Sequence, residues 1–476
     1  MLVPGAGPRT SGADARAALV RGEVRNSLRG GHATGTPLIG FRTTSAIPVT
    51  GPVIVVGLPS GGRQSNDKRY PIAVLGTSRR GLLTSDSTRI PGLVSIADVA
   101  PTALGTDEAL GSQAANDPVA RVLALDREIR DNATGGLAGA LIAAVLILLL
   151  AWLRPRAAAL GFATGLAANL ALGLAGVTDP WAAAVTIGLA IGLGAPLLAL
   201  WVDTPVAVGA VLAAVLVAYL VALGVDGTAV ALSPFGPQQN SRFYGVSNLL
   251  ETMLLVPAFG AAALLFRRFG WGAFAAVALV AFVTVAGDRF GADGGGAIVL
   301  GVGYAVLAVL LAGGGRRALA GAVVGAAALV VLLVGLDAAT GGSSHVTRSL
   351  RRGPVHLAED LRDRVALSYD RAVVHWYVAL LVAAGLAALV LLAVRLSRSD
   401  APRADQAVPL AIAAAVATSL VVNDSPAEVI VCGLVGFVAA LPGRLARDAS
   451  PPPPARARLA ARRGRLRRRE DSRAPA

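Results

Sequence analysis

The chain is poor in the residue types from which soluble enzymes build reactive centres. Its 476 residues include one cysteine, four histidines and one lysine. The single cysteine, Cys432, excludes an intramolecular disulfide. A centre with two metal ions needs several His and Asp ligands, and His32 is the only histidine in the first 130 residues. Neither a metal nor a cofactor is expected.

Charge is also scarce, whereas long apolar runs are frequent. Charged residues make up 15% of the chain and hydrophobic residues 54%, with a mean hydropathy of +0.64. Runs of about 16–20 apolar residues match a bilayer core of about 30 Å, and they are apolar on all sides. The sequence therefore predicts an all-α polytopic membrane bundle surrounded by a lipid bilayer. Eleven spans are expected, at residues 135–153, 157–175, 181–201, 205–223, 249–266, 270–287, 296–312, 318–336, 377–396, 407–422 and 427–441.

The arginines predict the orientation of this bundle. They follow every second span boundary, where cytoplasmic loops lie under the positive-inside rule. The loop 337–376 departs from the pattern with six arginines, including Arg348, Arg351 and Arg352, but it also has five acidic residues. We expect a multi-pass cell-membrane protein with an extracytoplasmic N-terminus and a cytoplasmic C-terminus. The arginines that set this orientation are Arg154, Arg156, Arg267, Arg268, Arg316, Arg317, Arg395, Arg398 and Arg403.

The C-terminal tail, residues 442–476, is strongly basic. Nine arginines lie between Arg456 and Arg473, after the spacer Pro451–Pro454. A proline-rich spacer followed by a run of like charge is typical of disorder. Basic segments next to a membrane favour anionic lipid, which is the expected partner of the tail. Nucleic acid is not expected, because no aromatic or fold signature accompanies the charge.

Residues 1–134 have the composition of a small extracytoplasmic α/β domain. Val53–Val56 and Ile72–Leu75 are predicted to be short buried strands, each followed by a glycine turn. Residues 115–130 are predicted to form a helix leading into the first span. The first residues contain no apolar signal segment. We favour a start that is truncated relative to related proteins over a first span acting as a reverse signal-anchor.

Polar residues interrupt the apolar pattern at four places on the predicted extracytoplasmic side. Arginine suits phosphate, because its planar fork donates two hydrogen bonds, and a carboxylate or histidine beside it can act as a base. If the segment 244–251 is helical, its polar residues share one face. The candidate bases are Glu251, Asp424 and His345, and the candidate substrate-binding residues are Arg242, Tyr244, Asn248, Arg289, Asp293 and Asn423.

Two simpler interpretations stay open for these residues. The charges could be ion pairs that close the bundle, and Gly294–Gly296 could only allow close helix packing. An amphipathic helix is also predicted near 353–376, because Leu357, Leu361 and Val365 recur at a spacing of four. It would serve either as a cap over the bundle or as a lid.

The segment Gly81–Leu104 resembles the closing segment of alkaline-phosphatase-superfamily domains. It contains the strand-like Gly81-Leu-Leu-Thr-Ser85 and the turn Asp98-Val-Ala-Pro-Thr102. Members with activity have an Asp-His-Gly metal motif after a central strand, but Gly57–Gly62 at the matching place contains neither Asp nor His. The resemblance therefore implies the remnant of a phosphatase-like domain, with no metal. Asp86 and Asp98 are expected to be turn and cap residues.

The spacing Arg242-x-x-Gly245-x-x-Asn248, followed by a glycine-rich turn and a long loop with a histidine, is similar to O-antigen ligase and polymerase-type membrane proteins. The whole arrangement resembles an uncharacterised bacterial, actinobacterial-type membrane-protein family. The first resemblance implies a site for a phosphorylated or lipid-linked glycan, with glycan transfer or ligation as the reaction. A transporter or permease is the first alternative, and a non-catalytic membrane anchor or scaffold is the second.

Overall fold

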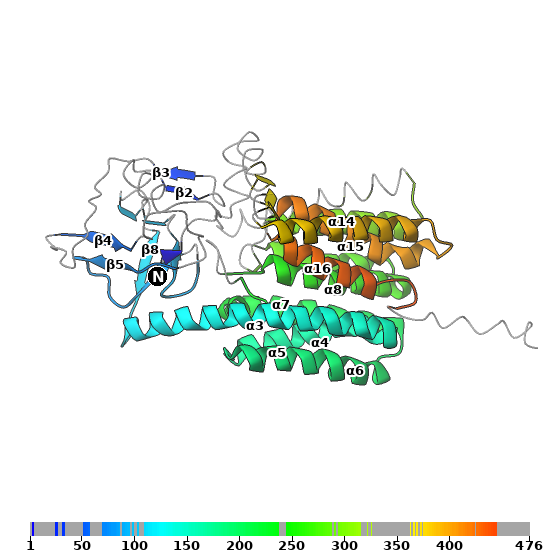
Figure 1. Cartoon of the computed structure of the whole chain (residues 1–476), viewed down its shortest axis with the longest axis horizontal. Coiled ribbons are helices and arrows are strands. Elements are labelled where there is room, and N and C mark those ends of the chain that lie inside the picture. Colours follow the sequence, from blue (N-terminus) through cyan, green and yellow to red (C-terminus); the bar gives the residue numbers. More distant parts are fainter. Residues whose placement is uncertain are drawn as a thin grey trace, which may run out of the picture.

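A helical bundle and a group of short strands lie end to end in the computed structural model (Figure 1). The structure describes residues 2–3, 24–26, 31–33, 51–57, 69–85, 88–95, 98–99, 102–103, 109–237, 244–287, 290–291, 294–315, 321, 325, 362, 365–366, 368–369, 372–373, 375–423 and 425–444.

The bundle confirms a multi-pass integral membrane protein. In the described ranges, eight helices are long and apolar enough to cross a membrane, and two shorter helices are also apolar. They begin and end at α3 Pro118–Leu153, α4 Pro155–Leu174, α5 Pro180–Leu189 with η1 Ala190–Gly194 and α6 Ala195–Trp201, α7 Pro205–Ala231, α8 Asn248–Phe269, α9 Trp271–Ala286, α10 Gly294–Leu311, α14 Trp376–Ser397, α15 Arg403–Val422 and α16 Pro426–Ala439.

The count of eleven spans stays a prediction. Ten of the predicted segments coincide with these helices, but α9 and α16 have only 16 and 14 residues. The one remaining predicted segment, 318–336, lies outside the described residues except at 321 and 325. The span predicted at 181–201 contains the short π-helix η1, so its backbone is not a regular α-helix throughout.

The first helix, α3, is much longer than a membrane span. Its 36 residues extend over about 54 Å, because an α-helix rises about 1.5 Å per residue. Gly135 lies against Pro180 at the start of α5, where a Cβ added to the glycine would be 3.1 Å from the proline Cα. From this level to Leu153 the helix is about 28 Å long, close to a bilayer core. The preceding 17 residues continue the same helix to the strands (Figure 1).

The positions of all five tryptophans agree with a membrane core that extends from the level of Gly135 to the level of Leu153. Trp152, Trp201 and Trp271 are exposed at one end of the bundle, and Trp181 and Trp376 are exposed at the other. Tryptophan gathers at both interfaces of a membrane, where its apolar ring and its N–H group are both accommodated. We call the end with Trp181 and Trp376 the strand-side end, and the opposite end the arginine end.

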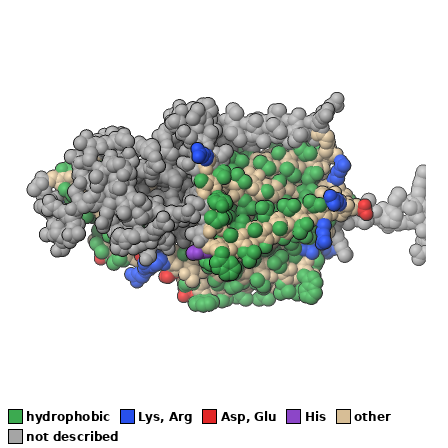
Figure 2. Space-filling view, turned by 45° about the horizontal axis from the view of Figure 1, so that its top comes forward, with side chains coloured by type: hydrophobic (Ala, Val, Ile, Leu, Met, Phe, Trp, Pro, Cys, Tyr) green, Lys and Arg blue, Asp and Glu red, His purple; other side chains and the backbone are tan. Residues whose placement is uncertain are grey.

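The arginine end collects exposed basic side chains at its helix termini. Figure 2 shows an apolar side face of the bundle with basic side chains at this end, all of them arginines because the one lysine of the chain is Lys68. Arg267 of α8 pairs there with Asp405 of α15, and the Arg403 guanidinium donates to the Gly313 carbonyl at 2.9 Å. Helix termini at this end have Arg154, Arg156, Arg267, Arg268, Arg395, Arg398 and Arg403.

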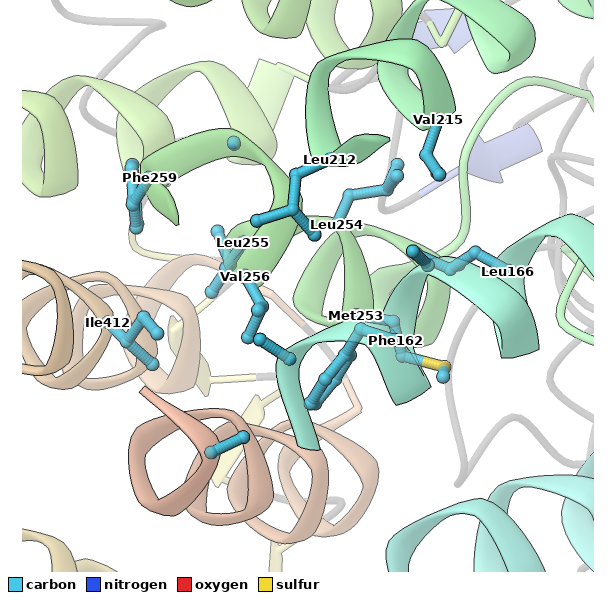
Figure 3. Close-up of a cluster of buried hydrophobic side chains, with 14 of the residues drawn as sticks. Phe162, Leu166, Leu212, Val215, Met253, Leu254, Leu255, Val256, Phe259 and Ile412 are labelled. Atoms are coloured by element: carbon cyan, nitrogen blue, oxygen red, sulfur yellow. The ribbon is translucent and has the colours of Figure 1, made fainter. Parts of the chain in front are cut away.

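Helix α8 lies at the centre of the bundle. It packs against α4, α7, α9, α10, α15 and α16. In its most apolar stretch 83% of the residues are buried, against 11% in α14. Figure 3 shows Leu212 of α7, Phe162 of α4 and Ile412 of α15 arranged around the α8 residues Met253–Val256. Any polar residue on α8 is therefore held by neighbours on several sides.

The strands form four separate two-stranded pairs in the described residues. β4 (Val53–Val56) and β5 (Ile72–Leu75) are antiparallel and have the predicted bounds. They are half-buried rather than buried as predicted, and Leu75 is 36% exposed, because each contributes its backbone to a two-stranded ladder. The other pairs are β1 (Leu2–Val3) with β7 (Val94–Ser95), β2 (Val24–Asn26) with β3 (Gly31–Ala33), and β6 (Leu82–Ser85) with β8 (Leu110–Gln113).

Candidate functional site

The N-terminus of α8 is fixed by a hydrogen-bonded cap. Ser247 is the N-cap residue, and its hydroxyl accepts from the Leu250 N–H at 3.0 Å and donates to the Phe235 carbonyl at 2.6 Å. Serine is favoured here because it satisfies an N–H group that has no partner within the helix. Glu251 lies in the first turn. The positive end of the helix dipole therefore favours its negative charge.

The Glu251 carboxylate is enclosed at the strand-side end. Glu251 is 1% exposed, and its Oε2 accepts a hydrogen bond of 2.8 Å from the Asn423 amide at the end of α15. The same amide group donates to the Ser419 hydroxyl at 2.8 Å. Glu251 is therefore buried among its neighbours at this end of the bundle. A carboxylate in such a place needs hydrogen-bond donors to offset the loss of water.

A second pair joins α8 to α16. The Asn248 amide donates to the Ser425 hydroxyl at 3.3 Å, immediately before α16 begins. Asn248 and Glu251 thus face the same turn between α15 and α16, as their spacing of three predicts. We call Asn248, Glu251, Ser419, Asn423 and Ser425 the Glu251 cluster. It joins three helices through polar groups at the strand-side end of the bundle.

Tyr244 does not share the helical face that was predicted for it. It precedes the cap of α8, and Gly245 turns the backbone away with a φ of 78°. A Cβ at Gly245 would be 2.0 Å from the Gly291 carbonyl oxygen, so only glycine fits this approach. The next residue, Val246, donates its N–H to the same carbonyl at 3.1 Å. The segment before α8 therefore lies against the turn between α9 and α10.

Five of the predicted site residues lie outside the described residues. Val246 and Gly291, which follow Arg242 and Arg289 by four and two residues in the sequence, are joined by a hydrogen bond. Asn423 and Ser425 flank Asp424. The five are Arg242, Arg289, Asp293, Asp424 and, in the long loop, His345.

The predicted amphipathic helix is described at a few positions. Residues 362, 365–366, 368–369 and 372–373 are helical. Ser368 is 4% exposed and donates its hydroxyl to the Leu420 carbonyl of α15 at 2.8 Å. Val365, predicted for the apolar face, is 40% exposed. This segment therefore touches the bundle one turn before Asn423.

A second buried polar cluster was missed by the sequence interpretation. The Asn169 amide on α4 donates to the Tyr219 hydroxyl of α7 at 2.9 Å and to the Ser233 hydroxyl at 3.0 Å. Its carbonyl oxygen accepts from the Phe235 N–H at 2.8 Å. Each of the three side chains is 0% exposed. We call Asn169, Tyr219 and Ser233 the Asn169 cluster; an isolated Asn inside an apolar span was the signal for it.

Asp98 has a structural role, as its predicted assignment as a turn or cap residue implies. It is 2% exposed and accepts from the Ser85 hydroxyl and from the Ser95 N–H. Asp86 lies outside the described residues. Within the part of the chain that the structure describes, no group of three or more His, Cys, Asp and Glu side chains could hold a metal ion.

No family model matches the chain, and no curated protein or solved structure gives a significant match. Any assignment of function therefore depends on the chemistry of the Glu251 cluster. That cluster has one ionisable group, several amide and hydroxyl groups, and the N-termini of α8 and α16.

Proposed function

We propose that the strand-side end of this membrane protein binds the phosphorylated head group of a lipid-linked glycan, on the extracytoplasmic side, and takes part in its transfer. The observation that supports it best is the buried Glu251 carboxylate held by an amide from another helix. Ionisable groups inside a membrane bundle are costly to bury and tend to be functional. The arginine end would face the cytoplasm, consistent with the positive-inside rule.

Each residue of the site has a defined chemical role in the proposal. Arg242 and Arg289 hold the phosphate; the segments that follow them are joined by the hydrogen bond between Val246 and Gly291. Glu251 takes the proton of an acceptor hydroxyl, whose oxygen then bonds to the anomeric carbon of the glycan. The bond from that carbon to the phosphate oxygen breaks, and the lipid phosphate leaves with its electron pair. Asn423 orients the carboxylate.

The resemblance of residues 242–248 to O-antigen ligase-type proteins supports the same class of reaction. In those proteins the donor is a glycan on a polyprenyl-phosphate carrier. The apolar sides of the bundle suit a donor whose lipid tail stays in the membrane while its head group reaches the strand-side end.

A binding measurement on the protein in lipid nanodiscs tests this proposal. Native mass spectrometry would compare polyprenyl phosphate with uncharged polyprenol. We expect wild type to prefer the phosphate and Arg242→Ala to lose about 10-fold or more in affinity for it, because a charge-assisted hydrogen bond contributes about 1.5–3 kcal/mol. Arg268→Ala, at the arginine end, is the matched control and should bind as wild type does. Equal binding of phosphate and alcohol by wild type contradicts the proposal.

A transporter is the second candidate, and one observation favours it. The helices that hold Glu251 and Asn423 both contain an interior proline, Pro257 in α8 and Pro409 in α15. Interior prolines interrupt helical hydrogen bonds and permit bending, as in the discontinuous helices of transporters. Proton uptake into proteoliposomes distinguishes the two: flux that Glu251→Gln abolishes supports transport, and binding of the carrier without flux supports the glycan site.

A further inference from the structure

A turn of the N-terminal segment, at residues 88–92, contacts Tyr244, which lies shortly before α8 and the Glu251 cluster. Among the described residues, Arg89 is the non-glycine residue with a positive φ, at 57°. Its guanidinium carbon lies 4.1 Å from the centre of the Tyr244 ring, a cation–π geometry. Tyr244 is 8% exposed. Arginine is rarely found in this left-handed conformation, so the turn must be held in it by surrounding contacts.

Several contacts hold the turn in this conformation. The Arg89 N–H donates to the Ser85 carbonyl at 2.8 Å, and the Gly92 N–H donates to the Leu83 carbonyl at 2.8 Å. The Thr88 hydroxyl donates to the Leu93 carbonyl across the turn. The apolar residues of the turn are buried in one cluster with the projecting part of α3 and the end of α7, formed by Ile90, Leu93, Leu125, Ile129, Ala231 and Leu232.

The projecting part of α3 supports the turn from the side. Arg69 forms an ion pair with Asp126 of α3 at 2.7 Å and is 8% exposed in its side chain. Asn132, one turn and a half further along, donates to the Leu232 carbonyl at 2.5 Å. The N-terminal segment and the bundle are therefore joined through the rigid helix, and not only through the loop at Tyr244.

From Tyr244 the connection to Glu251 is short and stiff. Gly245 is in backbone contact with Gly291, and Val246 donates to the same carbonyl. Ser247 caps α8 and is bonded to Phe235, which fixes the helix start four residues before Glu251. A displacement of the Tyr244 ring would therefore shift the first turn of α8, and the Glu251 carboxylate with it.

We propose that Arg89 is a positioning residue for the Glu251 cluster: it keeps Tyr244, and through it the start of α8, in the binding geometry. Its effect on ligand rests on the proposed function, but its effect on the loop does not. In this proposal the N-terminal segment contributes to the membrane site. The Arg89 guanidinium acts on Tyr244 and does not touch the ligand.

Replacement by glycine separates the side chain from the backbone. Glycine adopts a positive φ without strain, so Arg89→Gly relieves the turn while removing the guanidinium. We expect unchanged or higher thermal stability, together with hydrogen exchange about 2–5-fold faster in peptides covering residues 244–252, because Arg89 is exposed and a cation–π contact at an exposed site contributes about 0.5–1 kcal/mol. Arg89→Lys, which keeps a cation, should restore most of the protection.

The matched control is Arg79→Ala. Arg79 is in the same segment and donates to the Leu110 carbonyl at 3.1 Å, within the strand region. It should leave exchange at 244–252 unchanged. The affinity of nanodisc-embedded protein for polyprenyl phosphate should fall with Arg89→Gly by a factor similar to the change in exchange, and not with Arg79→Ala.

Two results would overturn the proposal: exchange at 244–252 in Arg89→Gly equal to wild type, or faster exchange with no change in the affinity for polyprenyl phosphate. If wild type binds no polyprenyl phosphate, the proposed function fails by itself. The exchange comparison in the absence of ligand then still decides whether Arg89 positions the start of α8.

Discussion

The Asn169 cluster is fully buried, whereas the Glu251 cluster combines the buried Glu251, Ser419 and Asn423 with the partly exposed Asn248 and Ser425, and the two clusters are built from different groups. In the first, neutral side chains use their donors and acceptors on one another and on nearby backbone: Tyr219 donates to the Leu166 carbonyl at 2.9 Å, and Ser233 to the Val230 carbonyl at 2.8 Å. In the second, a carboxylate is held by Asn423. A neutral network with matched partners stabilises a fold, whereas a buried charge is a weak source of stability.

The two clusters also differ in what they join. The Asn169 cluster connects α4 and α7 to the turn at Phe235, so it fixes a connection between helices. The Glu251 cluster joins the first turn of α8 to the end of α15 and the start of α16. The comparison predicts a division of roles: changes at Asn169 should affect stability, and changes at Glu251 should affect function.

The largest loss of stability is expected from Asn169→Leu. The substitution leaves the buried Phe235 N–H without its acceptor and removes two further hydrogen bonds. The free energy of unfolding should fall by about 3 kcal/mol, since an unsatisfied buried group costs about 1–3 kcal/mol and each lost bond about 1 kcal/mol. Thermal unfolding in detergent measures it.

Thr418→Ala is the control for this change. The Thr418 hydroxyl donates to the Ala414 carbonyl of its own helix, so its loss should matter little. An unfolding midpoint for Asn169→Leu as high as that of Thr418→Ala would show that the Asn169 network does not stabilise the bundle.

Glycine-to-alanine substitutions are expected to give the next largest loss of stability. They compare the helix packing beside each of the two clusters. A Cβ at Gly173, next to the Asn169 cluster, would lie 2.1 Å from the Ala229 carbonyl oxygen of α7. A Cβ at Gly433 on α16 would meet a Val416 methyl at 2.4 Å. Backbone cannot move aside as a side chain can, so Gly173→Ala should destabilise by about 2–3 kcal/mol and Gly433→Ala by about 1 kcal/mol. Denaturant titration of both variants measures the difference, and equal losses would contradict it.

The architecture was predictable because each membrane span appears in the sequence as a long apolar run. Ten of the eleven predicted segments coincide with helices, since in lipid every backbone group must be bonded within the segment. The strands Val53–Val56 and Ile72–Leu75 were also predicted with their bounds. The count of eleven is not tested, because residues 318–336 lie almost entirely outside the described residues.

The candidate site was predictable only in part. The spacing of Asn248 and Glu251 gives their common helical face, but the partners Asn423 and Ser425 come from about 170 residues away, and no local pattern gives that distance. Tyr244 was misplaced because a helix was extended through Gly245, whose φ of 78° ends that pattern. The Arg89–Tyr244 contact depends on how the N-terminal segment packs on α3, which sequence spacing alone does not determine.

Glu251→Gln should have the smallest effect on stability and a large one on function. Glutamine retains an oxygen that accepts from the Asn423 amide, and it removes a charge whose burial is costly. The free energy of unfolding should therefore change by less than about 1 kcal/mol, while transfer from a polyprenyl-linked glycan is lost because an amide cannot take up the proton. Asp405→Asn removes a carboxylate at the arginine end that pairs with Arg267, and should preserve both properties. If Glu251→Gln instead unfolds as readily as Asn169→Leu, Glu251 is a structural tie, and the two clusters do not differ in role.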